Sequence, residues 1–106
     1  MNNQTYRINY LPLFEQDLNE IVDYITVDLQ NPGAAHKLVD KVEEAIYKRL
    51  DNPLMYAPHT SSKARKHPYY KINVGNYSIF YVVIDDVMEV RRILYSRRNI
   101  DIDQLI

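Results

Sequence analysis

Cysteine is absent from this 106-residue chain, so the sequence offers no disulfide framework and no thiolate nucleophile. Long apolar runs are missing too: no segment approaches the roughly 18 residues that a membrane-spanning helix needs. The first residues, "MNNQTYRINYLPLF", lack the basic and then apolar pattern of a secretory signal. Internal repeats, low-complexity tracts and a linker are also missing. These absences predict one cytoplasmic domain, residues 1–106, large enough for a single modest core.

Charge is unevenly distributed, although the whole chain carries a formal net charge of only −1. Residues 1–62 contain five Lys/Arg and nine Asp/Glu, a net of −4, whereas residues 63–106 contain eight and five, a net of +3. The second half therefore forms either an ordinary solvated surface or a basic surface suited to an anionic partner. The most basic stretch is "RRILYSRRNI" at 91–100, where four arginines fall within eight positions.

Apolar periodicity predicts a strand followed by two helices. The alternating "TYRINY" at 5–10 is typical of a strand. After Pro12, helical spacing relates Phe14, Leu18, Ile21, Val22, Ile25 and Leu29. Asn31 and Pro32 are suited to the cap and first turn of a second helix, whose apolar face comprises Ala35, Leu38, Val42, Ala45, Ile46 and Leu50. The short connection predicts an antiparallel hairpin that buries Leu18, Ile21, Leu38, Val42 and Ile46.

Three further strands are predicted after an aperiodic loop at 54–68. They occupy 69–74, 77–84 and 87–95, separated by the turn signals "GN" and "DD". The complete order predicts an α+β fold: an N-terminal strand, a helical hairpin, and a three-stranded antiparallel meander, joined in one curved sheet packed on the helices. The other face of the sheet is then expected to be more polar, or covered by a partner.

Several stretches, in order, resemble one family nearly end to end. They are "FEQDLNEIVDYI", "PGAAHKLVDKVEEAI", "LDNPLMYAP" and, most diagnostic, "VGNYSIFYVV" followed by "VRRILYSRRNI". Together they resemble the RelE/ParE superfamily of bacterial toxin–antitoxin toxins. The resemblance implies a small protein that arrests growth when free and is held inactive by a cognate antitoxin in a hetero-oligomer. We expect a mostly helical and then extended antitoxin segment to meet the basic half of the chain.

Which target the toxin has is a separate question. ParE-like members of the superfamily poison DNA gyrase, whereas RelE-like members cut messenger RNA on the ribosome. Nuclease members resemble one another in an arginine just after the aromatic residue that opens the central strand, where this chain has Ser78. Their usual terminal Tyr or His-Tyr is also missing from "NIDIDQLI". Gyrase inhibition is therefore favoured, with a ribosome-dependent endoribonuclease and a non-toxic, antitoxin-binding relative as alternatives.

Candidate functional residues follow from the same comparison and from charge. If the chain is a nuclease, the catalytic candidates are Arg97, Arg98, Tyr95, Lys71 and Arg65, acting without metal. The candidates for target binding are Arg97, Arg98, Tyr95, Lys63, Arg65 and Lys66, although simple exposure would also explain their charge. His36, His59 and His67 lack metal-ligand spacing, so neither a metal nor a cofactor is expected.

The first two arginines of the basic stretch invite a structural interpretation. Arg91 and Arg92 are neighbours on a predicted strand, so their side chains must point to opposite faces. At least one of them is expected to have a packed stem and a guanidinium paired with an acid such as Asp23 or Glu89. We expect Arg92 to have this structural role.

Overall fold

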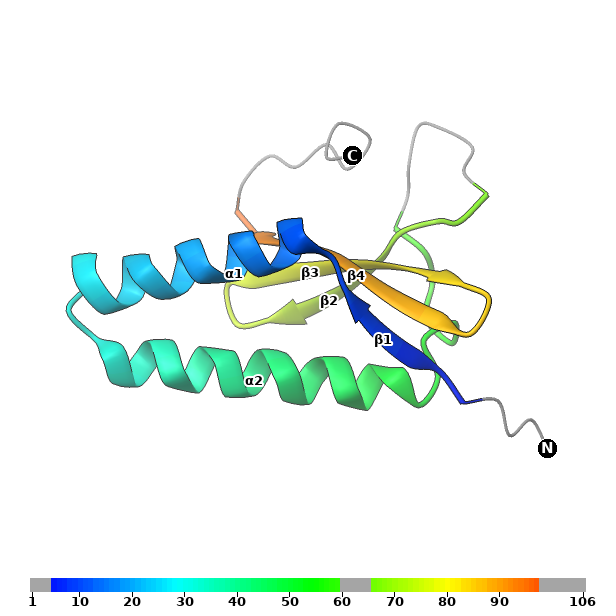
Figure 1. Ribbon diagram of the computed structural model, residues 1–106, viewed down its shortest axis with the longest axis horizontal. Helices are drawn as coiled ribbons and strands as arrows, with labels where there is room; N and C mark the ends of the chain where they lie inside the picture. The colour runs from blue at the N-terminus through cyan, green and yellow to red at the C-terminus, as the bar shows by residue number, and fades with distance from the viewer. Residues whose placement is uncertain (1–4, 60–65, 98–106) are drawn as a thin grey trace.

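The computed structural model describes residues 5–59 and 66–97, which form a helical hairpin packed on one four-stranded sheet (Figure 1). The elements in chain order are β1 (Arg7–Tyr10), α1 (Pro12–Asp23), the π-helical turn η1 (Tyr24–Asp28), α2 (Pro32–Leu50), β2 (Tyr70–Val74), β3 (Tyr77–Ile84) and β4 (Val87–Tyr95). Their order and class confirm the predicted α+β fold with its strand, hairpin and meander.

The strands are ordered β1-β4-β3-β2 across the sheet. The last three form the expected antiparallel meander, and Gly75 supplies the positive φ of 56° that the β2–β3 turn requires. β1 lies parallel to β4, with Arg7 opposite Val87 and Tyr10 opposite Val90. β1, the first strand of the chain, therefore forms one edge of the sheet beside β4, the last strand of the chain.

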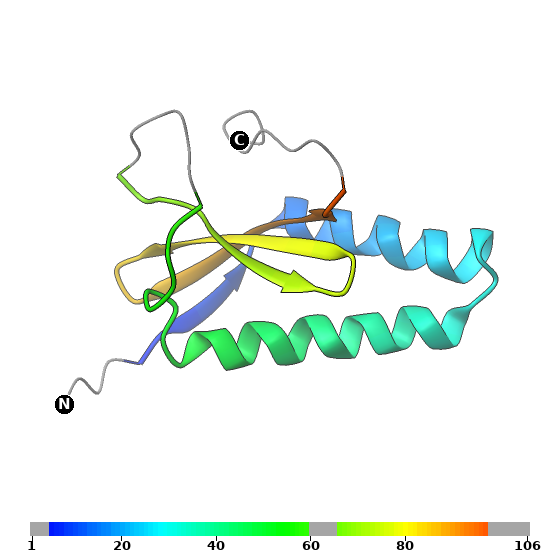
Figure 2. The same cartoon turned by 180° about the vertical axis from the view of Figure 1, so that it is seen from behind.

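Both faces of the sheet are apolar at their centres. The larger core lies under the helices and contains Phe14, Val42 and Ile46 together with strand residues such as Ile79 and Tyr81. On the opposite face, the residues that form a smaller apolar cluster are Tyr69, Phe80, Val82 and Leu94. Seen from behind, the chain that follows α2 crosses this face (Figure 2), and the His59 ring meets the Phe80 ring edge-on at 5.8 Å. The expectation of a polar face is thus wrong. Burial of β3 on both faces accounts for its nearly continuous apolar run.

The end of the first helix also departs from its apolar pattern. The Leu29 N–H donates to the Tyr24 carbonyl at 3.1 Å, a bond across five residues that makes η1 a π-helical turn. Because this turn is wider than an α-helical turn, the 3.6-residue period no longer predicts which side chains face the core. Leu29, expected on the apolar face, is 55% exposed, and Val27 is 67% exposed.

A β-bulge interrupts β4 at its first arginine. Phe80 of β3 lies opposite Arg92 while Tyr81 lies opposite Val90, so Arg91 is the extra residue. A bulge re-aims the side chains that follow it. Val90 belongs to the helix-side core before the bulge, and Ile93 belongs to it afterwards.

The five residues expected in the helical core are buried to different degrees. Val42 and Ile46 are fully enclosed, whereas Leu18, Ile21 and Leu38 are half-buried and pack against the same core. We therefore expect Ile46→Ala to cost about 2–5 kcal/mol of unfolding free energy, because a closed site leaves a cavity. Leu18→Ala and Leu38→Ala should each cost clearly less, as measured by urea denaturation. Equal losses at all three positions would contradict this order of packing.

Candidate functional site

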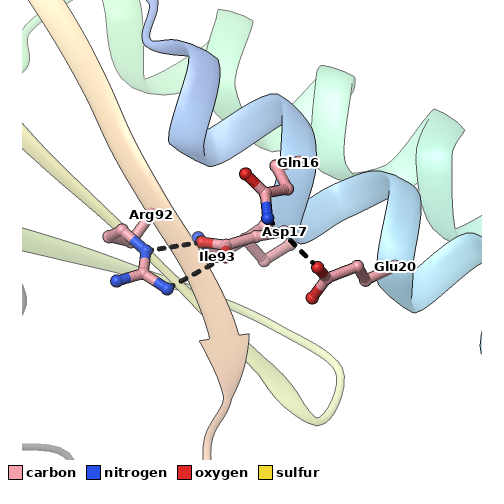
Figure 3. Close-up of polar contacts among 5 residues, drawn as sticks. All are labelled: Gln16, Asp17, Glu20, Arg92 and Ile93. Carbon is pink, nitrogen blue, oxygen red and sulfur yellow. Dashed lines mark hydrogen bonds and ion pairs between the residues drawn. The ribbon is translucent and has the colours of Figure 1, made fainter.

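The arginines of the basic stretch have different surroundings, and Arg92 is the most firmly held. Its Nε donates to Oδ2 of Asp17 at 2.7 Å and its terminal nitrogen Nη2 donates to Oδ1 at 2.9 Å (Figure 3). The same carboxylate accepts the backbone N–H of Ile93 at 3.2 Å. Asp17 is only 8% exposed. The hydrogen bonds that Arg92 donates to Asp17 raise the pKa of Arg92 above its usual value, so the guanidinium stays charged.

The position of Asp17 follows from where β1 stops. The last hydrogen bond between the two strands runs from the Leu11 N–H to the Val90 carbonyl at 3.0 Å. Pro12 then opens α1, and the helix crosses the edge of β4 that β1 no longer covers. Asp17 thereby supplies the acceptor that a neighbouring strand would have given to Ile93.

The expectation for the partner of Arg92 needs a correction. Asp23 lies six residues beyond Asp17, about 9 Å farther along the helix axis, and is exposed. Glu89 instead accepts Arg91 Nε at 2.8 Å, while Arg91 Nη1 donates to the Tyr69 hydroxyl at 3.1 Å. Arg91 and Arg92 therefore have separate acids. The simple alternation of faces from which this was expected does not hold here, because the bulge places both residues between the helix-side residues Val90 and Ile93. The sequence signal for Asp17 was its place on the apolar side of α1, three residues after Phe14.

Tyr95 faces the helices and lines a cavity. Its ring lies 5.8 Å from the Tyr77 ring, and both residues border a cavity of about 620 Å³ that Tyr24 and Ile21 also line. Burial raises the pKa of Tyr77, and the hydroxyls of Tyr95 and Tyr24 act in the same direction. Sequence reasoning missed this group of tyrosines, because they come from three elements and no local pattern relates them.

The nuclease candidates do not all come together. Lys71 lies opposite Phe80, so its side chain is on the face away from the helices, whereas Tyr95 lies opposite Tyr77 on the helix side. β3 also separates β2 from β4, which puts about 10 Å between their backbones. Arg97 and Lys66 are exposed. Lys63, Arg65 and Arg98 lie outside the described residues.

Ser78, which replaces the arginine of the nuclease pattern, is a buried hydroxyl. It is 2% exposed. Its Oγ donates to Oδ1 of Asn73 at 3.2 Å and lies 2.8 Å from the Ser96 hydroxyl. These contacts tie β2, β3 and the end of β4 together.

Within residues 5–59 and 66–97, no three His, Cys, Asp or Glu side chains are grouped as a metal site would need. His36 contacts Asp40 at 3.6 Å on the surface of α2, and His67 is partly exposed. In the same described part of the chain, no helix is both long and apolar enough to cross a membrane.

A second hollow lies between the two helices. It measures about 290 Å³, and its walls are mainly apolar and aromatic, with two glutamates at the rim. Tyr10 and Phe14, whose rings stack at 5.4 Å, form its floor with Leu18, and Tyr47 of α2 is 59% exposed beside it. This groove between α1 and α2 therefore presents mainly apolar surface.

Comparison with known proteins identifies a family and solved structures that are similar to this chain. Residues 8–100 match the family described as the ParE toxin of the type II toxin–antitoxin system parDE. The fold is similar to the chromosomal ParDE system from P. aeruginosa, with a TM-score of 0.71, 18% identity, and coverage of 88% of this chain and 98% of that chain.

Two further solved structures share the fold. One is the E. coli DinJ-YafQ toxin–antitoxin complex, with a TM-score of 0.56, 14% identity, and coverage of 86% of this chain and 92% of that chain. The other is YafQ from E. coli strain BL21(DE3), with a TM-score of 0.55, 16% identity, and coverage of 86% and 93%. No curated protein sequence matches the chain significantly.

Proposed function

This chain belongs to the ParE toxin family of type II toxin–antitoxin systems, and from that premise we propose that it arrests growth by poisoning DNA gyrase. Its action is binding: Arg97, which is exposed just after β4, and the next residue of the chain, Arg98, hold an acidic or phosphate group of the gyrase–DNA complex. Guanidinium groups suit this task because each stays charged and donates two parallel hydrogen bonds.

The observation that carries this choice over RNA cleavage is the environment of Ser78. RelE-like nucleases resemble one another in an arginine at this place, where a cation stabilises the charge that develops on the phosphate. Here the position holds a neutral hydroxyl that is buried and bonded to Asn73 and Ser96. The phosphate would lose one of the cations that the reaction needs.

The placement of Tyr95 supports the same choice. A general base must lie within hydrogen-bond reach of the proton that it removes. The Tyr95 ring packs beside Tyr77 on the helix side, while Lys71 belongs to the opposite face. The two groups cannot act together on one phosphate.

The partner that restrains a type II toxin is its antitoxin, and the groove between α1 and α2 is where we propose that an antitoxin helix binds. Tyr10, Phe14 and Tyr47 would pack against its apolar face. An extended stretch following that helix then reaches the basic half of the chain. Hydrogen exchange of the complex should show new protection both in α1 and α2 and within 66–97. Protection limited to the helices would remove the extended contact from the proposal.

Induced expression of the full chain tests the target. We expect filamentation, DNA-damage signalling and gyrase-dependent cleavage of DNA, with intact messenger RNA at the onset of arrest. Purified chain should raise the amount of gyrase–DNA cleavage complex in vitro. As a matched control, Arg97→Ala with Arg98→Ala should not.

Two outcomes would overturn the proposal. Messenger RNA cut on ribosomes before any DNA damage would identify a nuclease. Normal growth at high levels of folded chain, together with antitoxin binding, would identify a non-toxic relative.

A further inference from the structure

The cavity between the first helix and the outer edge of β4 has walls of unusual composition. Tyr24, Tyr77 and Tyr95 contribute three aromatic rings, and Ile21 and Leu29 add aliphatic surface. Tyr24 is 51% exposed and Tyr95 is 40% exposed, so their ring faces are accessible from solvent. Aromatic faces carry negative electrostatic potential and attract cations that lie over them.

The charged groups around this cavity favour a cation as well. Its ionisable lining comprises Asp17, Glu20 and Arg92, leaving one excess negative charge. Arg92 is paired with Asp17 through two hydrogen bonds. The Glu20 carboxylate is exposed and accepts a 3.3 Å bond from the amide of Gln16, four residues earlier on α1 (Figure 3). Its charge also helps to raise the pKa of Arg92, after the larger effect of Asp17. Glu20 therefore remains available to a cationic ligand.

The backbone beside the cavity offers a further binding feature. Pairing with β3 places Ile93 opposite Ile79 and Tyr95 opposite Tyr77, and the Ile93 N–H points outward to Asp17. Because outward and inward groups alternate along an antiparallel strand, the backbone groups of Tyr95 point to the same side. In the described part of the chain, β1 covers β4 only as far as Val90. Asp17 of α1 occupies this edge at Ile93, so the stretch left to accept an extended peptide is the one at Tyr95.

We propose that this cavity is a cation subsite: it binds an arginine or lysine side chain carried on an extended segment that pairs with β4 near Tyr95. The aliphatic stem of that side chain lies against Ile21 and Leu29, its cationic head lies among the tyrosine rings, and Glu20 pairs with the head. The segment belongs to the antitoxin, and this assignment rests on the antitoxin partner proposed above. The subsite thus selects a basic residue, although Arg97, which follows β4, is itself basic.

A peptide titration tests the subsite without any toxicity assay. The probe is the blocked pentapeptide Ac-Thr-Val-Arg-Val-Thr-NH2, added to the ¹⁵N-labelled full chain, and the comparison peptide carries norleucine in place of arginine. We expect amide shifts centred on residues 20–29, 77 and 93–95. The norleucine peptide should bind about three- to fivefold more weakly, which is the size expected for a cation over exposed aromatic rings.

Variants separate the charge from the fold. Glu20→Gln should weaken binding of the arginine peptide about threefold or more and leave binding of the norleucine peptide unchanged, since only a charged head meets this carboxylate. Tyr24→Leu should weaken the arginine peptide similarly. Glu44→Gln, an equal change on the exposed surface of α2, is the control and should alter neither.

Three results would overturn the subsite. They are equal binding of the two peptides, shifts centred outside the cavity, and shifts of the same residues with chain concentration alone. The last result would assign this face to a second copy of the chain. Failure here leaves gyrase poisoning intact, because the titration contains no gyrase. Failure of the gyrase assay likewise leaves the peptide result standing.

Discussion

Replacing Arg92 with alanine should lower the free energy of unfolding by about 3–5 kcal/mol, because the change leaves the carboxylate of Asp17 buried without its cation. Asp17 is 8% exposed, and two of its three hydrogen bonds come from Arg92. For a domain with the usual 5–15 kcal/mol of stability, such a loss approaches unfolding. Urea denaturation of the purified variant measures it directly.

A matched ion pair elsewhere provides the control. Arg7 also donates two hydrogen bonds to one carboxylate, that of Asp86, at 3.2 and 3.1 Å. These side chains are 70% and 46% exposed, compared with 17% and 9% for Arg92 and Asp17. Arg7→Ala should therefore change stability little, because water screens the pair and solvates the remaining charge. Similar losses in the two variants would show that burial of Asp17 is not the cause.

A second result separates the charge of the Asp17–Arg92 pair from its hydrogen bonds. Arg92→Lys keeps the positive charge but gives up the two parallel hydrogen bonds. Its free energy of unfolding should therefore lie between that of the wild type and that of Arg92→Ala. Replacing both members with apolar residues, Asp17→Leu with Arg92→Met, should restore much of the loss because no charge is left buried. Recovery stays incomplete, since the Ile93 N–H then lacks its acceptor.

Replacing Arg97 and Arg98 together with alanine should abolish growth inhibition while leaving the melting temperature almost unchanged. Arg97 is exposed after the end of β4, so the fold does not depend on its contacts. Each hydrogen-bonded charge contact contributes about 1.5–3 kcal/mol, so losing two should weaken target binding about 10²–10⁴-fold. Growth curves after induction, paired with thermal melts, measure both effects.

Substitution by lysine sharpens this test. Lysine at 97 and 98 keeps the charge and loses the planar fork, so it should restore toxicity only partly. Lys37→Ala with Lys41→Ala removes the same charge from the exposed surface of α2 and should leave toxicity unchanged. A folded and fully toxic Arg97→Ala, Arg98→Ala variant would remove both arginines from the mechanism.

Local patterns in the sequence were enough for the elements and for the family. The alternation in "YYKINV" and the helical spacing from Phe14 to Ile25 depend on neighbours a few residues apart, so they can be interpreted without a fold. Arg91 and Arg92 were expected to diverge because neighbours on a strand face opposite ways, but the β-bulge that breaks this alternation is not visible in any local pattern. The sequence by itself therefore determined the strand, hairpin and meander, and it indicated that the paired arginines have different roles.

Only the tertiary structure decided what those side chains meet. Asp17 and Arg92 are 75 positions apart, and their contact depends on β1 ending at Tyr10 so that α1 crosses the edge of β4. The tyrosine-lined cavity likewise joins three elements, and the π-helical turn exposes Leu29 against its apolar pattern. Such contacts are set by how whole elements pack, a long-range property that no local period encodes.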